Sequence, residues 1–143
     1  MILVDVNLLL YAFQTGFEQH RPAKTWLDER LNGSDPVALP WQSLLGFLRI
    51  TTNRRVFPRP TPMVEAWQQV NDWLAAPVAW VPQATSRHEA VLGRLLALPG
   101  VVANLVQDAE LAALAIEHDL TLCSADRDFA RFLGLRWENP LAG

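Results

Sequence analysis

The sequence is poor in cysteine and has no long apolar run, and each shortage excludes a class of protein. Cys123 is the only cysteine, so no disulfide can form within the chain, which favours the reducing cytoplasm. No uninterrupted apolar stretch approaches the roughly 18 residues that a membrane-spanning helix needs. The first residues lack a basic segment ahead of an apolar run, which argues against a signal peptide. We therefore expect a cytoplasmic protein.

Positive charge is scarce as well. The formal net charge is −3 and Lys24 is the only lysine, so the surface as a whole does not attract nucleic acid. One basic stretch is nevertheless free of acids, and its arginines are Arg49, Arg54, Arg55 and Arg59. These arginines could pair with the phosphates of RNA. Two alternatives stay open for them, a solvated loop or a surface that meets a protein partner.

Several common catalytic motifs are missing. The seven glycines are isolated, which excludes a glycine-rich phosphate loop. The histidines are scattered and unmatched, which argues against a histidine-based zinc site; they are His20, His88 and His118. His118 is expected at the carboxyl end of a helix, where its charge suits the helix dipole. No serine lies in a nucleophile elbow.

What the chain does contain is a regular alternation of short apolar strands with amphipathic helices. We expect strands at residues 1–4, 37–39, 78–81, 121–123 and 135–137. We expect helices at residues 7–13, 17–31, 41–52, 61–75, 86–97 and 105–118, and a short helical turn at 126–132. Such alternation predicts a parallel sheet covered by helices on both faces. Without repeats, low-complexity runs or linkers, the sequence indicates one α/β domain over residues 1–143.

The helices expected at 61–75 and 86–97 carry additional signals. Thr61 and Pro62 have the order of an N-cap followed by proline at the first helical position. The run Ser86-Arg87-His88-Glu89 fits a capping box. Trp67 and Trp73 lie on a broad apolar face, which suggests contact with a partner helix or a second subunit.

The first strand ends in two polar residues, Asp5 and Asn7. Its apolar run predicts burial on both faces. In open parallel sheets, ligands bind beyond the carboxyl ends of the strands, and Asp5 is expected at that place. The alternative is that Asp5 or Asn7 merely caps the next helix. Other carboxylates at the same edge would favour a ligand site.

Two later segments supply such carboxylates. Asp108 is expected in the first turns of its helix, on the apolar face that docks against the sheet. Asp126 and Asp128 closely follow the strand at 121–123 and are expected beyond its carboxyl end. Interaction with the helix dipole is the alternative for Asp108, and helix capping is the alternative for Asp126 and Asp128.

Together these segments bring four aspartates to one rim, with no lysine or arginine expected nearby. A hard divalent cation with oxygen ligands, Mg²⁺ or Mn²⁺, is the simplest relief of their repulsion. Such an ion lowers the pKa of a bound water and neutralises a phosphate in the transition state. The arrangement therefore predicts phosphodiester hydrolysis.

Three acidic motifs follow one another along the chain. They are Asp5-Val6-Asn7, Asp108-Ala109-Glu110-Leu111-Ala112-Ala113-Leu114-Ala115 and Ser124-Ala125-Asp126-Arg127-Asp128-Phe129. These motifs resemble those of the PIN-domain ribonucleases, and the whole chain resembles the VapC-type toxins of toxin–antitoxin pairs in length and motif order. Two further stretches are similar to a VapC subgroup common in actinobacteria, Leu44-Leu45-Gly46-Phe47-Leu48-Arg49 and Leu135-Arg136-Trp137-Glu138-Asn139-Pro140-Leu141.

The resemblance implies a PIN-like three-layer α/β/α sandwich around a parallel sheet of four to five short strands. It implies a Mg²⁺- or Mn²⁺-dependent endoribonuclease that cleaves RNA, most often transfer RNA, and is neutralised by a cognate VapB-type antitoxin. It also implies a homodimer and a groove that holds the antitoxin tail.

The resemblance also assigns residues. The family's metal-binding acids correspond to Asp5, Asp108 and Asp126, with Asp128 as a frequent fourth acid of the catalytic site. The supporting residues are a small hydroxyl residue beside the site and a polar residue that orders it, which correspond to Ser124 and Asn7.

One departure from the family keeps other functions open. The family usually has a glutamate where this chain has Gly46, so the number of bound cations is open and one is expected. A PIN fold that binds RNA or protein without cleaving is therefore an alternative. A haloacid-dehalogenase-type phosphatase with Asp5 as nucleophile is a more remote one, because Asn7 replaces its second aspartate and Lys24 is badly placed.

Overall fold

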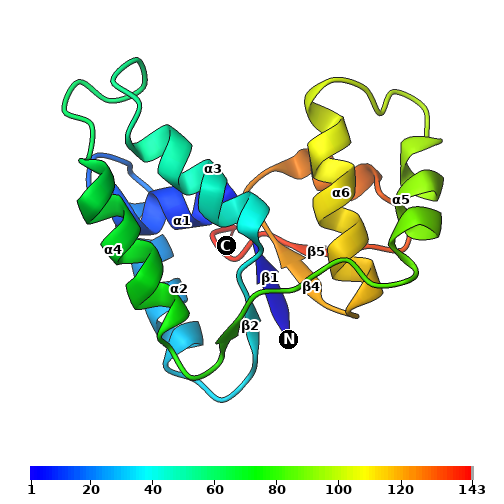
Figure 1. Cartoon of the computed structure of the whole chain (residues 1–143), viewed down its shortest axis with the longest axis horizontal. Coiled ribbons are helices and arrows are strands. Elements are labelled where there is room, and N and C mark those ends of the chain that lie inside the picture. The colour runs from blue at the N-terminus through cyan, green and yellow to red at the C-terminus, as the bar shows by residue number, and fades with distance from the viewer. Residues whose placement is uncertain (143) are drawn as a thin grey trace.

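The computed structural model describes residues 1–142, so Gly143, the last residue of the predicted domain, lies outside the described residues. Its elements are, in chain order, β1 (Ile2–Val4), α1 (Val6–Phe13), α2 (His20–Leu31), β2 (Val37–Ala38), α3 (Trp41–Thr51), α4 (Met63–Leu74), β3 (Ala79–Trp80), α5 (His88–Leu96), α6 (Asn104–Glu117), β4 (Thr121–Cys123), the 3₁₀ helix η1 (Arg127–Arg131) and β5 (Arg136–Glu138). Every predicted strand and helix has a counterpart (Figure 1). None of the helices in this part of the chain is long and apolar enough to cross a membrane.

The strands form one sheet in the order β3-β2-β1-β4-β5, and every neighbouring pair is parallel. β1 is central: Ile2 pairs with Val37 of β2, and Val4 pairs with Cys123 of β4. Because parallel strands point the same way, the carboxyl ends of β1 and β4 meet at one edge of the sheet. The predicted parallel sheet is confirmed.

Helices cover both faces of the sheet. Ile2 and Val4 belong to a core shared with α1, α2, α3 and α4. Leu3 points to the other face and belongs to a core shared with α5, α6 and η1. Figure 1 shows α1 to α4 on one side of the sheet and α5 and α6 on the other. The three-layer α/β/α fold expected from the resemblance is confirmed.

Helix α6 places its first turns above the central strands by means of small residues. Alanine is the best helix former, and its short side chain lets a helix backbone come close to its neighbours. The fully buried alanines of α6 are Ala109, Ala112, Ala113 and Ala115. Asp108 precedes this buried run and is half-buried. The predicted docking face of the helix is therefore confirmed.

Three helix starts differ from the prediction by two or three residues. Helix α2 begins at His20, because a turn occupies the residues after Gly16. Helix α4 begins after Pro62 without a side-chain cap, and the Thr61 hydroxyl instead contacts Thr51 at 3.5 Å. Helix α5 begins at His88 without the predicted capping box. The Thr85 hydroxyl takes that place by accepting a hydrogen bond from the backbone N–H of Arg87.

His88 has two acidic partners within the fold, Glu110 and Glu117. Its Nδ1 hydrogen-bonds to Oε2 of Glu117, whose side chain is fully buried. Oε1 of Glu117 accepts hydrogen bonds from Thr85 N at 2.9 Å and Thr85 Oγ1 at 2.7 Å. Glu117 therefore ties the segment before α5 onto the end of α6. His118 caps that end, as predicted.

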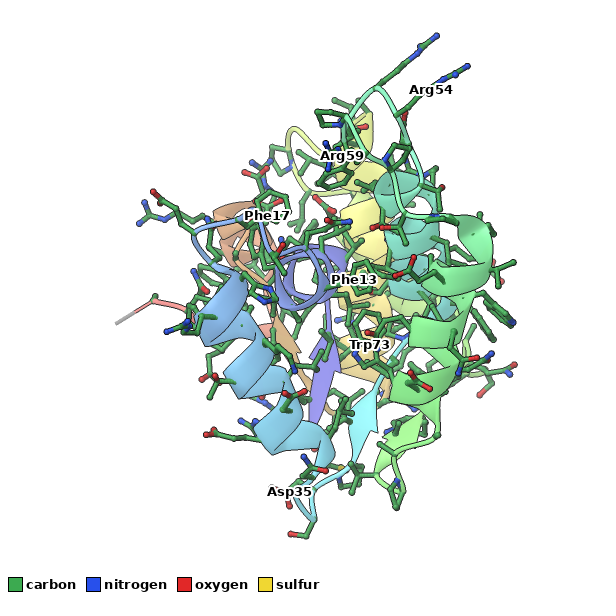
Figure 2. The ribbon with its side chains drawn as sticks, turned by 90° about the vertical axis from the view of Figure 1, so that its left-hand side faces the viewer. Phe13, Phe17, Asp35, Arg54, Arg59 and Trp73 are labelled. Atoms are coloured by element: carbon green, nitrogen blue, oxygen red, sulfur yellow. The ribbon has the colours of Figure 1, made fainter. Side chains whose placement is uncertain are left out.

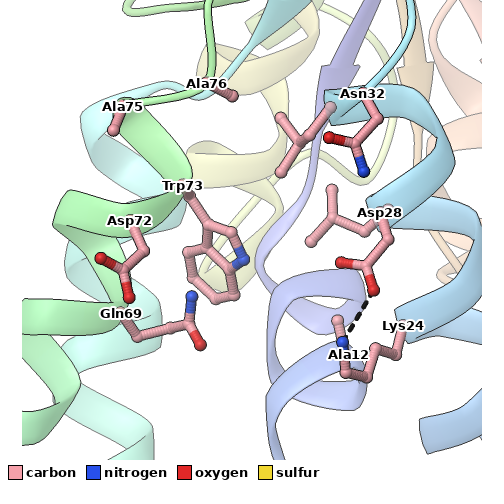
Figure 3. A pocket seen from close by; sticks show the side chains of 11 residues that line it. Ala12, Lys24, Asp28, Asn32, Gln69, Asp72, Trp73, Ala75 and Ala76 are labelled. Carbon is pink, nitrogen blue, oxygen red and sulfur yellow. Dashed lines mark hydrogen bonds and ion pairs between the residues drawn. The ribbon is translucent and has the colours of Figure 1, made fainter.

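The two tryptophans of α4 have different surroundings. Trp73 is 7% exposed and packs edge-on against Phe47 of α3, with ring centroids 4.8 Å apart. Figure 3 shows Trp73 as a wall of an open cavity of about 400 Å³ between α2 and α4. Trp67 is 44% exposed and stacks on Trp41. Of the two tryptophans on the predicted apolar face, Trp73 is therefore buried against α3 of the same chain, and Trp67 remains exposed.

Candidate metal centre

The carboxyl ends of β1 and β4 lie side by side and carry the first residues of the site. Asp5 N donates a hydrogen bond to Cys123 O at 3.0 Å. Ser43 of α3 donates from Oγ to Val4 O at 2.7 Å and so fixes the end of β1. Asp5 and Ser124, the next residue of each segment, are therefore presented at the same edge of the sheet.

Asp5 caps α1 with one carboxylate oxygen and faces β4 with the other. Its Oδ1 accepts a hydrogen bond from Val6 N at 2.8 Å. Its Oδ2 accepts from Ser124 Oγ at 2.7 Å and from Asn7 Nδ2 at 3.3 Å. The capping role is confirmed, and it leaves Oδ2 directed at the segment that follows β4.

Asn7 and Ser124 hold that segment in place. Asn7 Nδ2 donates to Ser124 Oγ at 3.1 Å, and Asn7 Oδ1 accepts from Ala125 N at 3.2 Å. Ser124 Oγ also accepts from Asp126 N at 3.0 Å. The sequence singled out both residues, and the structure brings them together as one hydrogen-bonded unit between β1 and β4.

Asp108, Asp126 and Asp128 converge from α6 and from the start of η1. Each offers a carboxylate oxygen within 4.8 Å of those of the other two. Asp126 also caps η1, because its Oδ1 accepts from Asp128 N at 2.9 Å. A set of closely spaced carboxylate oxygens fits a hard divalent cation such as Mg²⁺ or Mn²⁺.

Burial and mutual repulsion raise the pKa of two of these acids. Burial raises the pKa of Asp108 to about 6, and the charges of Asp5, Asp126 and Asp128 add to the rise. Burial also raises the pKa of Asp5; the charge of Asp126 adds to this rise, while hydrogen bonds to the carboxylate oppose it. Because like charges that lie close together raise one another's pKa, the part of each rise that comes from the other acids reflects repulsion among the four carboxylates.

The expectation of a site without lysine or arginine is wrong. Arg131, at the end of η1, places Nη2 3.6 Å from Oδ1 of Asp128. Its charge lowers the pKa of Asp108, opposing the rise caused by burial and by the other acids. The signal in the sequence was its position three residues after Asp128 in an expected helical turn, which puts both side chains on one face.

Gly46 lies against α1, next to the site. An added Cβ at this position would lie 3.1 Å from Val6 Cγ2, and Val6 directly follows Asp5. The glycine therefore lets α3 approach the start of α1. It also means that α3 contributes no carboxylate at this position.

The four arginines singled out in the sequence lie on α3 and in the connection that follows it. Arg49 is in the last turn of α3 and lines an open cavity of about 640 Å³ between α3 and α6. Arg54, Arg55 and Arg59 are exposed in the connection to α4, and Figure 2 labels Arg54 and Arg59 in this part of the chain. Within residues 1–142, none of the four forms a hydrogen bond or ion pair with an acid of the site.

Comparison with known proteins agrees with this fold. The PIN domain family model matches residues 2–134. Ribonuclease VapC37 of Mycobacterium tuberculosis is 50% identical over 142 residues, which cover 99% of this chain and 99% of that protein. Ribonuclease VapC33 of the same species is 43% identical over 141 residues, again covering 99% of each chain.

Solved structures show the same fold at low identity. The VapBC2 structure from Rickettsia felis, bound to a promoter DNA fragment, matches with a TM-score of 0.70 and 17% identity over 97% of this chain and 98% of that chain. The FitAcB structure from Neisseria gonorrhoeae matches with a TM-score of 0.66 and 20% identity over 98% of each chain. The chain belongs to the PIN-domain family, and its full-length relatives place it among the VapC ribonucleases within that family.

Proposed function

We propose that this protein is the toxin of a type II toxin–antitoxin pair and cleaves RNA as a metal-dependent endoribonuclease. The observation that carries the proposal is the convergence of Asp108, Asp126 and Asp128 within 4.8 Å of one another. These acids lie beside Asp5, at the sheet edge where open parallel sheets bind ligands. The named VapC ribonucleases that match along the whole chain support the same activity.

The proposed cofactor is Mg²⁺, with Mn²⁺ as a substitute, held by Asp5, Asp108 and Asp126, and Asp128 is the fourth acid of the catalytic site. A bound divalent ion supplies a water of lowered pKa and neutralises charge on a phosphate. Asn7 and Ser124 orient Oδ2 of Asp5 through the hydrogen bonds described above. Because Gly46 of α3 provides no carboxylate where the family usually has a glutamate, we propose that one cation is bound.

For partners, we propose an RNA substrate, with transfer RNA as the target, a VapB-type antitoxin and a second copy of the chain. The VapBC2 and FitAcB structures, which share this fold, support the antitoxin. Arg49, Arg54, Arg55 and Arg59 are proposed to contact RNA phosphates from the exposed side of α3 and its loop. We further propose that residues 1–143 form one domain and that the protein acts in the cytoplasm.

The second candidate is a PIN fold that binds RNA or protein without cleaving. The absence of a carboxylate at Gly46 favours it, because one family acid is missing. The phosphatase alternative lacks support. Its lysine would have to be Lys24, which forms an exposed ion pair with Asp28 on α2 at 2.7 Å.

Purified protein incubated with total transfer RNA separates the two candidates. We expect cleavage with Mg²⁺ or Mn²⁺, loss of cleavage with EDTA, and no cleavage by Asp5→Asn, which removes a charge and little volume. Expression of Asp5→Asn should also be harmless to cells. Binding of RNA without cleavage in every metal would support the non-catalytic candidate, and full toxicity of Asp5→Asn would overturn the site. Sequencing the new 5′ ends after brief expression identifies the RNA that is cut.

A further inference from the structure

Arg131 is fixed at the rim of the acidic site. The neighbouring Phe129 and Phe132 are 1% and 2% exposed, so the turn that carries Arg131 is anchored in the core. Arg131 Nε donates a hydrogen bond to Asp128 O at 3.3 Å, and Nη2 lies 3.6 Å from Asp128 Oδ1. The guanidinium is therefore held beside the carboxylates by both backbone and side-chain contacts.

The outer nitrogens of Arg131 have donors to spare. A guanidinium carries five N–H donors, and among residues 1–142 only Nε of Arg131 makes a hydrogen bond. Other arginines use these groups within the fold: Arg136 donates from Nη1 and Nη2 to Asp119 at 2.9 and 2.8 Å. The side chain of Arg131 is 38% exposed, so its guanidinium is accessible to a ligand at the acidic site.

A phosphate fits these donors better than any other group of the RNA. A planar guanidinium binds phosphate oxygens through two parallel hydrogen bonds. The acids repel a phosphate, and a cation at the site together with one fixed arginine offsets that repulsion. We propose that Arg131 is a phosphate-binding residue, which contacts the RNA backbone at the bond held against Asp108, Asp126 and Asp128. This inference rests on the proposed ribonuclease activity.

Cleavage of total transfer RNA with Mn²⁺ tests the role, with Arg131→Gln as the variant and Arg127→Gln as the matched control. Arg127 lies on the same 3₁₀ helix, is exposed, and forms no ion pair or side-chain hydrogen bond within residues 1–142. For Arg131→Gln we expect KM to rise about tenfold, because a hydrogen bond between charged groups is lost. For Arg127→Gln we expect a change of less than about twofold.

The salt dependence of RNA binding distinguishes a phosphate contact from a purely structural role, because a structural role would not change it. The affinity of a protein for RNA falls as the salt concentration rises. Each phosphate contact to a single strand makes the plot of log affinity against log salt steeper by about 0.7. Arg131→Gln should make the plot less steep by about 0.7. Arg131→Lys keeps the charge, so it should keep the steepness of the wild type and have a KM between those of the wild type and Arg131→Gln. Equal thermal melting of all variants checks that they are folded.

Two outcomes would overturn the inference. One is an unchanged KM and salt slope in Arg131→Gln. The other is tighter Mn²⁺ binding with unchanged RNA binding, which would make Arg131 only a counter-ion of Asp128. Both leave the ribonuclease activity intact. A wild-type protein that cleaves no RNA in Mn²⁺ would instead contradict the proposed function itself.

Discussion

Ser124 Oγ donates a hydrogen bond to Asp5 Oδ2 at 2.7 Å and thereby joins the ends of β1 and β4. The same oxygen accepts from Asp126 N at 3.0 Å, and Ser124 is fully buried. One hydroxyl therefore positions residues that come from the two ends of the chain. Asn7 of α1 donates hydrogen bonds to both Asp5 and Ser124, so the three side chains form one hydrogen-bonded group.

Removing that hydroxyl should loosen the site and leave the fold intact. For Ser124→Ala we expect the free energy of unfolding to fall by about 1 to 2 kcal/mol, because Asp126 N loses its acceptor. We also expect cleavage to need more Mn²⁺, because Oδ2 of Asp5 is no longer oriented. Urea unfolding and a Mn²⁺ titration of the cleavage rate measure both effects. Ser34→Ala, in the exposed turn before β2, is the control, and an unchanged Mn²⁺ requirement would contradict the positioning role.

The stability of the metal-free protein should fall as the pH rises through about 6. The pKa of Asp108 is raised from 3.8 to about 6 in the folded protein, so the folded state holds this proton more tightly than the unfolded chain does. The resulting stabilisation is full below pH 3.8 and is lost as the pH rises through about 6. The melting temperature in EDTA should therefore decrease between pH 5 and pH 8.

Asp108→Asn tests the origin of that dependence. With the charge removed, we expect the metal-free protein to be more stable at pH 8 by about 1 kcal/mol, a value reduced for screening by solvent at a half-buried group. Its melting temperature should also vary less with pH. Calorimetry of both proteins in EDTA measures this, and Mn²⁺ should stabilise the wild type more than the variant. A lower melting temperature of the metal-free variant would show that the acids do not repel one another.

The order of the elements could be predicted from the sequence because each strand is a compact apolar run and each helix has an apolar face. The acids of the site could be predicted because parallel strands carry Asp5 and Asp126 to one edge. Arg131 was not predicted, although its spacing of three residues from Asp128 in an expected helical turn was a signal, because only the acids of that segment were considered. The contact between His88 and Glu117 was not predicted either, because Glu117 is distant in the sequence and comes near His88 only when α5 packs against α6.

Glu117 should contribute to stability rather than to catalysis. Burial raises the pKa of Glu117, but hydrogen bonds from Thr85 and His88 outweigh burial and lower it below its usual value. Its contribution is therefore present above pH 4.5 and is lost as the pH falls through the lowered pKa.

For Glu117→Ala we expect a loss of about 2 kcal/mol, because the half-buried donors of Thr85 and His88 lose their acceptor. Chemical unfolding at pH 7 measures the loss. Glu89→Ala on the exposed face of α5 should change stability by less than about 0.5 kcal/mol. Equal effects of the two substitutions would show that the buried hydrogen bonds of Glu117 do not stabilise the fold.

Whether alanine at position 46 stabilises or destabilises the fold should depend on its contact with Val6. An added Cβ would lie 3.1 Å from Val6 Cγ2, and a valine in a helix has one strongly preferred rotamer, so Val6 cannot turn away cheaply. Overpacking of this kind costs about 1 to 3 kcal/mol, whereas replacing glycine by alanine within a helix gains about 1 kcal/mol.

We therefore expect Gly46→Ala to lower the free energy of unfolding by about 1 kcal/mol in the wild type. In a Val6→Ala background the clash is absent, and the same substitution should raise it by about 1 kcal/mol. A double-mutant cycle by urea unfolding measures both changes, and cleavage should fall in Gly46→Ala alone, because Val6 directly follows Asp5. The same sign in both backgrounds would show that contact with Val6 does not require glycine at this position.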